Sequence, residues 1–163
     1  MSVKIWDWDK KKRTMLRFIK PGDIFCFPYD QSKYCFGRII SKIMTGHVAE
    51  IFDYMSADPI MNEGILSNSK RLMQVVILDS YSLFDRKSEG DWRIIGHEEN
   101  YVPQNVENIY FTYGVASSCK RMDIFSENII SIDESEKSKY IEVSPHGDID
   151  VKRLVAKKLN EDL

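Results

Sequence analysis

Residues 21–54 read PGDIFCFPYDQSKYCFGRIISKIMTGHVAEIFDY, and this stretch decides the fold. Three of its runs are rich in aromatic and β-branched residues, which predicts three strands. These runs span residues 24–29, 34–44 and 47–54. The breaks between them, DQSK at 30–33 and TG at 45–46, are of hairpin length and too short to hold a crossover helix. The stretch therefore predicts an antiparallel meander.

Gly37 lies in the middle of the second predicted strand, where a missing side chain indicates a bulge or a bend. Pro28, near the end of the first strand, cannot donate to a β-ladder and so favours a strand terminus or an edge. A bent meander of this kind predicts a small barrel or half-barrel. The expected fold class is α+β and predominantly antiparallel β, with a curled meander and a C-terminal helix.

The closing helix is expected at 151–160, because apolar residues fall on one helical face there. That face consists of Val151, Leu154, Val155 and Leu159. Asp148 or Asp150 is positioned to cap the helix. Further short β-rich runs predict strands elsewhere in the chain, and one short helix is expected at 60–66. The runs span residues 14–19, 70–78, 91–95, 109–113, 119–125, 129–132 and 140–143.

The whole chain, residues 1–163, has no repeat and no linker, so a single domain is expected. It is 43% hydrophobic and 29% charged, which is typical of a soluble globular protein. The N-terminus has acids where a signal peptide needs an apolar run, and no stretch approaches about 20 apolar residues, so we expect a cytoplasmic protein without a membrane partner. The three cysteines have no metal-ligand spacing and are expected to be reduced core residues; two of them, Cys26 and Cys35, lie in neighbouring strands and could face each other.

No group of residues carries a recognisable catalytic pattern. The histidines, His47, His97 and His146, are scattered, and only His97 has nearby carboxylates. Neither a P-loop, a dinucleotide-binding glycine pattern nor a nucleophile elbow is present in the sequence. We therefore expect no enzyme, no cofactor and no metal site. The basic run at 10–13 is read as a solvated turn, and no nucleic-acid partner is expected.

Three motifs in the meander carry a resemblance to a known family. They are KPGDIF-x-FP at 20–28, Y-x-FGRII at 34–40 and V-x-EIFDY at 48–54. Together they resemble the opening of the immunity protein 26 family of bacterial polymorphic toxin systems. The resemblance implies a cytoplasmic antidote that binds the C-terminal domain of a cognate toxin, and it brings no catalytic residues with it.

The stretch 79–107 is the expected partner-binding surface. It holds seven acidic and three basic residues and interleaves them with aromatic ones, a composition suited to steering and anchoring a basic partner. A nuclease toxin, with its phosphate-binding surface, would be such a partner. The candidate contact residues are Asp85, Glu89, Asp91, Trp92, Glu98, Glu99 and Tyr101. The residues alone also leave open another interpretation, in which Trp92 belongs to the core and the acids are ordinary surface charge.

A second interpretation comes from another class of protein. The PGDI start and the curled meander are also similar to the small SH3-like barrel of ribosome-independent endoribonuclease toxins, which bind or cleave RNA. The basic run at 10–13 and Arg38 would then contact phosphate. The net charge of −2 disfavours this interpretation.

Overall fold

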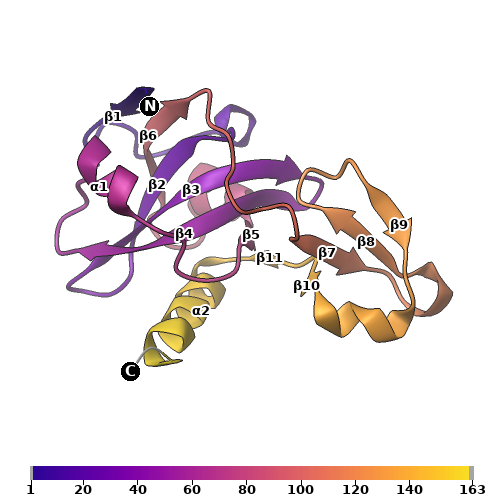
Figure 1. The fold of residues 1–163 in the computed structure, drawn as a ribbon. Coiled ribbons are helices and arrows are strands. Elements are labelled where there is room, and N and C mark those ends of the chain that lie inside the picture. The colour runs from indigo at the N-terminus through magenta and orange to yellow at the C-terminus, as the bar shows by residue number, and fades with distance from the viewer. Residues whose placement is uncertain (1, 162–163) are drawn as a thin grey trace.

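The three strands expected within residues 21–54 form the centre of a seven-stranded sheet (Figure 1). The structure is a computed structural model that describes residues 2–161. In sheet order the strands are β1 (Ser2–Ile5), β6 (Arg93–Glu99), β2 (Asp23–Pro28), β3 (Tyr34–Ile43), β4 (Gly46–Ser56), β5 (Val76–Leu78) and β11 (Pro145–His146). Both hairpins of the meander are antiparallel, as predicted.

Gly37 bends β3, as the sequence predicted. The register between β3 and β4 shifts beside it, and a Cβ atom at this position would collide with the backbone carbonyl of Glu50 and the ring of Phe25. The neighbouring strand and the Phe25 ring therefore come closer than any residue other than glycine allows.

The sheet does not close into a barrel. Its two edges are β1 and β11, and β11 joins β5 in parallel. The expected α+β class with an antiparallel meander is confirmed. Of the two expected forms, barrel or half-barrel, the closed barrel is corrected to an open sheet, because β1 and β11 do not pair with each other.

A second, four-stranded sheet extends to one side of the first (Figure 1). Its strands, in sheet order, are β10 (Ile141–Glu142), β7 (Tyr110–Tyr113), β8 (Lys120–Asp123) and β9 (Ile129–Ser131). The β-rich runs at 119–125 and 129–132 predicted strands here, and the structure pairs them as the antiparallel strands β8 and β9. That these strands belong to a separate sheet was not predicted.

The helical segments are short except for the last one. They are η1 (Leu16–Phe18), α1 (Glu63–Asn68), η2 (Tyr81–Asp85), η3 (Ala116–Ser118), η4 (Glu134–Lys139) and α2 (Asp148–Glu161). The strand expected at 14–19 is wrong, since this segment forms η1. Its backbone N–H groups at Thr14 and Leu16 donate to Phe84 and to the Asp85 side chain instead of to a neighbouring strand.

Strand β6 is longer than predicted. It continues through Gly96, which the sequence had indicated as its end. A Cβ atom at Gly96 would lie 2.8 Å from the carbonyl oxygen of Lys4 and 2.8 Å from the Ile5 side chain. This glycine thus lets β1 approach β6 rather than ending the strand.

Both faces of the large sheet are covered. One face packs against α2 and η2 around the aromatic residues Phe25, Phe27 and Trp92. On the other face, α1 and the N-terminal segment cover an apolar cluster that includes Phe36 and Phe52, and the second sheet covers another that includes Ile40. The face expected of the closing helix is confirmed, because Val151 and Val155 are buried in this core.

Cys26 and Cys35 do not face each other. They lie on opposite faces of the sheet, because Cys26 is paired with Phe36 across the hairpin and Cys35 with Phe27. Burial raises the pKa of both thiols, that of Cys35 to about 12. Both are free thiols in the core, as is Cys119.

Within residues 2–161, no helix has the length and apolar character needed to cross a bilayer.

Candidate partner-binding surface

The seven predicted contact residues fall into two groups at opposite ends of β6. Asp85, Glu89, Asp91 and Trp92 precede the strand, whereas Glu98, Glu99 and Tyr101 lie at its end or just after it. Five residues of strand, 93–97, lie between Trp92 and Glu98 and hold the two groups about 20 Å apart. The acidic stretch of the sequence is therefore not one continuous patch.

In the first group, two of the three carboxylates already have cationic partners. Asp85 accepts hydrogen bonds from Arg13 at 2.5 Å and from the backbone N–H of Leu16 at 2.9 Å, and these bonds hold its pKa below the usual range. Asp91 is bonded by both Lys87 and Arg93 at 2.9 Å. Although partial burial opposes this, the two cations lower the Asp91 pKa.

Glu89 is exposed, but one of its carboxylate oxygens accepts a hydrogen bond from the backbone N–H of Asp148 at 3.1 Å. Asp148 is the first residue of α2, so Glu89 satisfies a free N–H group at the helix N-terminus. The sequence predicted that Asp148 or Asp150 would cap this helix. The cap instead comes from a residue 59 positions earlier in the chain.

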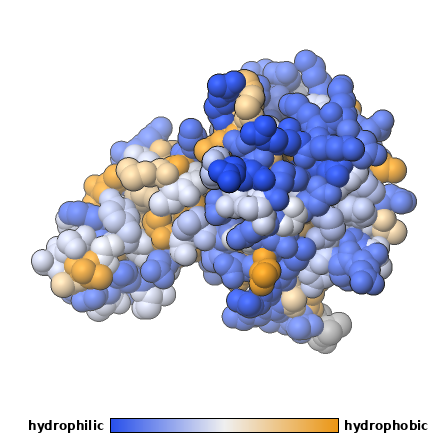
Figure 2. All heavy atoms as spheres, turned by 180° about the vertical axis from the view of Figure 1, so that it is seen from behind, coloured by the Kyte–Doolittle hydropathy of each residue, from blue (hydrophilic) through white to orange (hydrophobic). Residues whose placement is uncertain are grey.

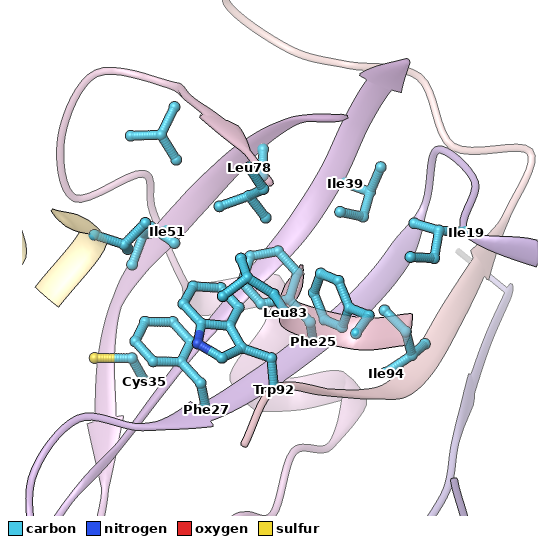
Figure 3. Packing of buried hydrophobic residues seen from close by; sticks show 14 of the residues in the cluster. Ile19, Phe25, Phe27, Cys35, Ile39, Ile51, Leu78, Leu83, Trp92 and Ile94 are labelled. Carbon is cyan, nitrogen blue, oxygen red and sulfur yellow. The ribbon is translucent and has the colours of Figure 1, made fainter. Parts of the chain in front are cut away.

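Trp92 is fully buried, so its predicted role as a surface anchor is corrected to a core role. Its ring stacks on Phe27 with the ring centres 3.8 Å apart (Figure 3). Its indole N–H donates to the Asp148 carboxylate at 2.8 Å. It thereby joins the large sheet to the start of α2.

At the far end of β6, Glu98 and Tyr101 belong to a charged network on the sheet face opposite α2. Glu98 accepts from Arg38 at 2.7 Å, and the Arg38 guanidinium lies 4.4 Å from the centre of the Tyr101 ring. Burial raises the Tyr101 pKa to about 12. Glu99, in contrast, is exposed and forms only a 3.6 Å pair with Lys4.

Glu50 is the centre of this network, and the sequence analysis missed it. Its side chain is only 6% exposed and binds Arg38 at 2.7 Å and Arg71 at 3.0 Å, one through each carboxylate oxygen. Arg38 and Glu50 are partners across the hairpin of β3 and β4, but a register shift between Ile39 and Ser41 places them opposite each other, so counting from the turn did not predict the pair. Arg71, from a later segment, gave no signal either.

The network around Glu50 holds the segment that leads to the second sheet against the large sheet. Arg71 donates to the backbone carbonyls of Gln104 and Asn105 at 2.9 and 3.1 Å. These residues lie on the segment that leads from β6 to β7. Arg38 on β3 and Glu50 on β4 lie between the two apolar clusters of the sheet face opposite α2, the one with Phe36 and Phe52 and the one with Ile40.

The histidines are held inside the fold. His97 bonds Asp23 at 2.9 Å rather than the adjacent Glu98 and Glu99, and burial raises the pKa of Asp23. His47 bonds Ser80 at 2.8 Å in the core, where it is 1% exposed. Among residues 2–161, no three His, Cys, Asp or Glu side chains are grouped so that they could hold a metal ion.

Arg38, a phosphate-contacting candidate in the endoribonuclease interpretation, has its guanidinium bonded by Glu50 and Glu98. Both carboxylates compete with any phosphate for its donors.

Comparisons with known proteins bear on the meander most directly. Neither the curated proteins nor the solved structures gave a match. The family model of immunity protein 26 matches residues 20–123, from the residue before the PGDI motif to the end of β8. The match covers 104 of the 163 residues and includes all three strands of the meander with the Arg38 and Glu50 pair. The chain therefore belongs to the immunity protein 26 family.

Proposed function

We propose that this protein is an antitoxin that binds the C-terminal domain of one cognate toxin in the cytoplasm and blocks its activity, within a contact-dependent inhibition or polymorphic toxin system. The observation that carries the proposal is the family match over residues 20–123. The family name indicates an immunity protein, and an immunity protein acts on a toxin. In this role the chain presents a surface and makes or breaks no covalent bond.

A nuclease is the toxin class that fits the predicted charge pattern best. Nucleases carry basic surfaces that bind phosphate, and carboxylates on an inhibitor can occupy such a surface and speed its capture. Of the predicted contact residues, Glu99 and Glu89 keep exposed side chains, and the Asp91 side chain is 44% exposed. Glu99 has the weakest internal partner of the three and is the leading candidate for steering.

The first experiment tests the antitoxin role itself. The probe is the C-terminal domain of a cognate toxin, sought first in the reading frame directly upstream, and it is produced with and without this chain. We expect cells that express the domain alone to stop growing and cells that express both to survive, with a stable complex on purification. A toxic domain that neither binds this chain nor loses toxicity in its presence would refute the proposal.

The second experiment tests the steering charge. Glu99→Lys should slow association with the same toxin domain several-fold and flatten its dependence on salt, with little change in the dissociation rate. Asp58→Lys makes the same charge change at another exposed position and serves as the control. Equal kinetics for the two variants would remove Glu99 from the contact surface.

A further inference from the structure

Strand β9 is an open edge of the second sheet. Within residues 2–161 it pairs only with β8, and it lies on the outer side of the lobe that projects from the large sheet (Figure 1). Two hydrogen bonds fix the ladder: Ile132 N–H donates to Cys119 at 3.1 Å, and Asp123 N–H donates to Asn128 at 3.2 Å.

These two bonds determine which backbone groups remain available. Because bonded and non-bonded pairs alternate in an antiparallel ladder, Ile130 is the residue of β9 that exchanges hydrogen bonds with β8. The backbone N–H and C=O groups of Ile129 and Ser131 consequently point away from the sheet. They form a row that another extended chain can bond.

The same edge carries apolar side chains on both faces. Ile129 and Ile130 alternate across the strand and are 50% and 47% exposed. Five of the eleven large apolar side chains exposed in the described part of the chain lie in or beside this sheet, and Figure 2 shows apolar atoms gathered on the projecting lobe. The five are Tyr113, Val115, Phe125, Ile129 and Ile130.

The surroundings of the edge are acidic. Residues 123–136 contain five Asp and Glu and no Lys or Arg. Asp123 and Glu136 accept backbone hydrogen bonds in the adjoining turns. The other three carboxylates, at Glu127, Asp133 and Glu134, are exposed and have no ion pair within residues 2–161. The paired strand β8 brings two cations: Lys120 donates to the Ser131 hydroxyl at 2.7 Å, and Arg121, opposite Ile130, donates to the Tyr140 hydroxyl at 3.0 Å.

We propose that β9 accepts an extended segment of the toxin domain as a fifth strand of the second sheet. The segment carries apolar side chains that alternate onto Ile129 and Ile130, and basic residues that meet the carboxylates on either side. This inference rests on the proposed antitoxin function and deepens it. The family match ends at Asp123, so β9 lies outside the matched region.

A proline at position 131 tests the edge directly. The Ser131 N–H points outward, so Ser131→Pro removes a donor from the open edge without removing a bond to β8, and proline is tolerated at edge positions. Ser131→Ala is the matched control, because it also loses the hydroxyl contact with Lys120 but keeps the N–H. We expect Ser131→Pro to weaken toxin binding about tenfold or more relative to Ser131→Ala.

Hydrogen exchange on the unaltered protein provides a test that does not depend on a variant folding. The amides of Ile129 and Ser131 should exchange fast in the free protein and become protected in the complex, whereas Ile130, already bonded to β8, should change less. Glu127→Lys with Glu134→Lys should also slow association, because it reverses two of the flanking charges.

The outcomes separate this inference from the proposed function. If the unaltered chain neutralises the toxin while the Ile129 and Ser131 amides stay unprotected and Ser131→Pro binds like Ser131→Ala, the docking edge is refuted and the antitoxin role stands. If Ser131→Pro instead abolishes a dimer of this chain and leaves toxin binding intact, the edge serves a second copy and the proposal is wrong. If the unaltered chain does not bind the toxin at all, both fail.

Discussion

At the scale of single residues, His47 shows how burial lowers the pKa of a histidine. Its ring is 1% exposed, and Nδ1 bonds the Ser80 hydroxyl at 2.8 Å. Burial, with a smaller effect of Lys42, lowers the His47 pKa to about 4 from an ordinary value of 6.5. The folded chain therefore holds this imidazole neutral at a pH where the unfolded chain protonates it.

This difference predicts a loss of stability in mild acid. Between pH 6.5 and 4 the unfolded state binds more protons at His47, so the stabilisation is complete above pH 6.5 and falls as the pH approaches 4. A shift of this size corresponds to about 3 kcal/mol. His47→Gln, whose amide can still bond Ser80, should flatten the pH dependence of the urea unfolding midpoint across this range.

His146→Gln is the control, because this side chain is partly exposed. The control should keep the pH dependence of the unaltered protein. An identical slope in His47→Gln and the unaltered protein would contradict the assignment of the acid sensitivity to His47.

At the scale of elements, α2 depends on a residue outside itself. Its packed face of Val151 and Val155 was readable from the helical spacing. The hydrogen bond at its N-terminus could not be predicted from the helix sequence, because Glu89 comes from the turn before β6. Trp92 adds a second link from the same turn by donating to Asp148.

Removal of the Glu89 charge is expected to weaken this helix. Glu89→Gln should lower the free energy of unfolding by about 1 kcal/mol, because a carboxylate at a helix N-terminus bonds a free N–H and interacts with the helix dipole. The backbone amide hydrogens at the start of α2 should also exchange faster in this variant. Glu107→Gln, at an exposed position with no ion pair in the described part of the chain, should change the unfolding free energy by less than about 0.5 kcal/mol. Equal stability of the two variants would show that the Glu89 charge contributes nothing to the stability of α2.

At the scale of the whole molecule, two devices join the sheets. An apolar cluster with Ile40 and Phe111 lies between them, and the network around Glu50 holds the connection from β6 to β7 against the large sheet. The Glu50 carboxylate is bonded by two guanidinium groups, of which Arg38 is 16% and Arg71 19% exposed.

Glu50→Gln should therefore be strongly destabilising, since it leaves two largely buried cations without their shared carboxylate. We expect a loss of about 2–4 kcal/mol, slightly below the range for fully buried pairs because both arginines keep some contact with water. Glu99→Gln breaks an exposed pair with Lys4 and should cost less than about 1 kcal/mol. Urea unfolding of both variants measures the difference, and similar losses would mean that the network has no special role in stability.

The sequence predicted the local parts of this architecture well. Three runs rich in aromatic and β-branched residues and two short breaks were enough to predict the meander, and Gly37 was enough to predict its bend. The strand predicted at 14–19 was wrong, because the backbone N–H of Leu16 bonds the side chain of Asp85, 69 residues away, and the segment forms η1. The predicted end of the strand before Gly96 was also wrong, because the missing side chain at Gly96 lets β1 approach β6.

The sequence by itself determined the antiparallel meander, the packed face of α2 and the family to which the chain belongs, because each depends on residues close together along the chain. The tertiary structure alone decided which carboxylates are paired internally, that Trp92 is core, and that β9 forms an open edge. The physical reason is the range of the interactions. Local spacing fixes strands and helical faces, whereas ion pairs such as those of Glu50 and Glu98, and the order of strands in a sheet, join residues that only folding brings together.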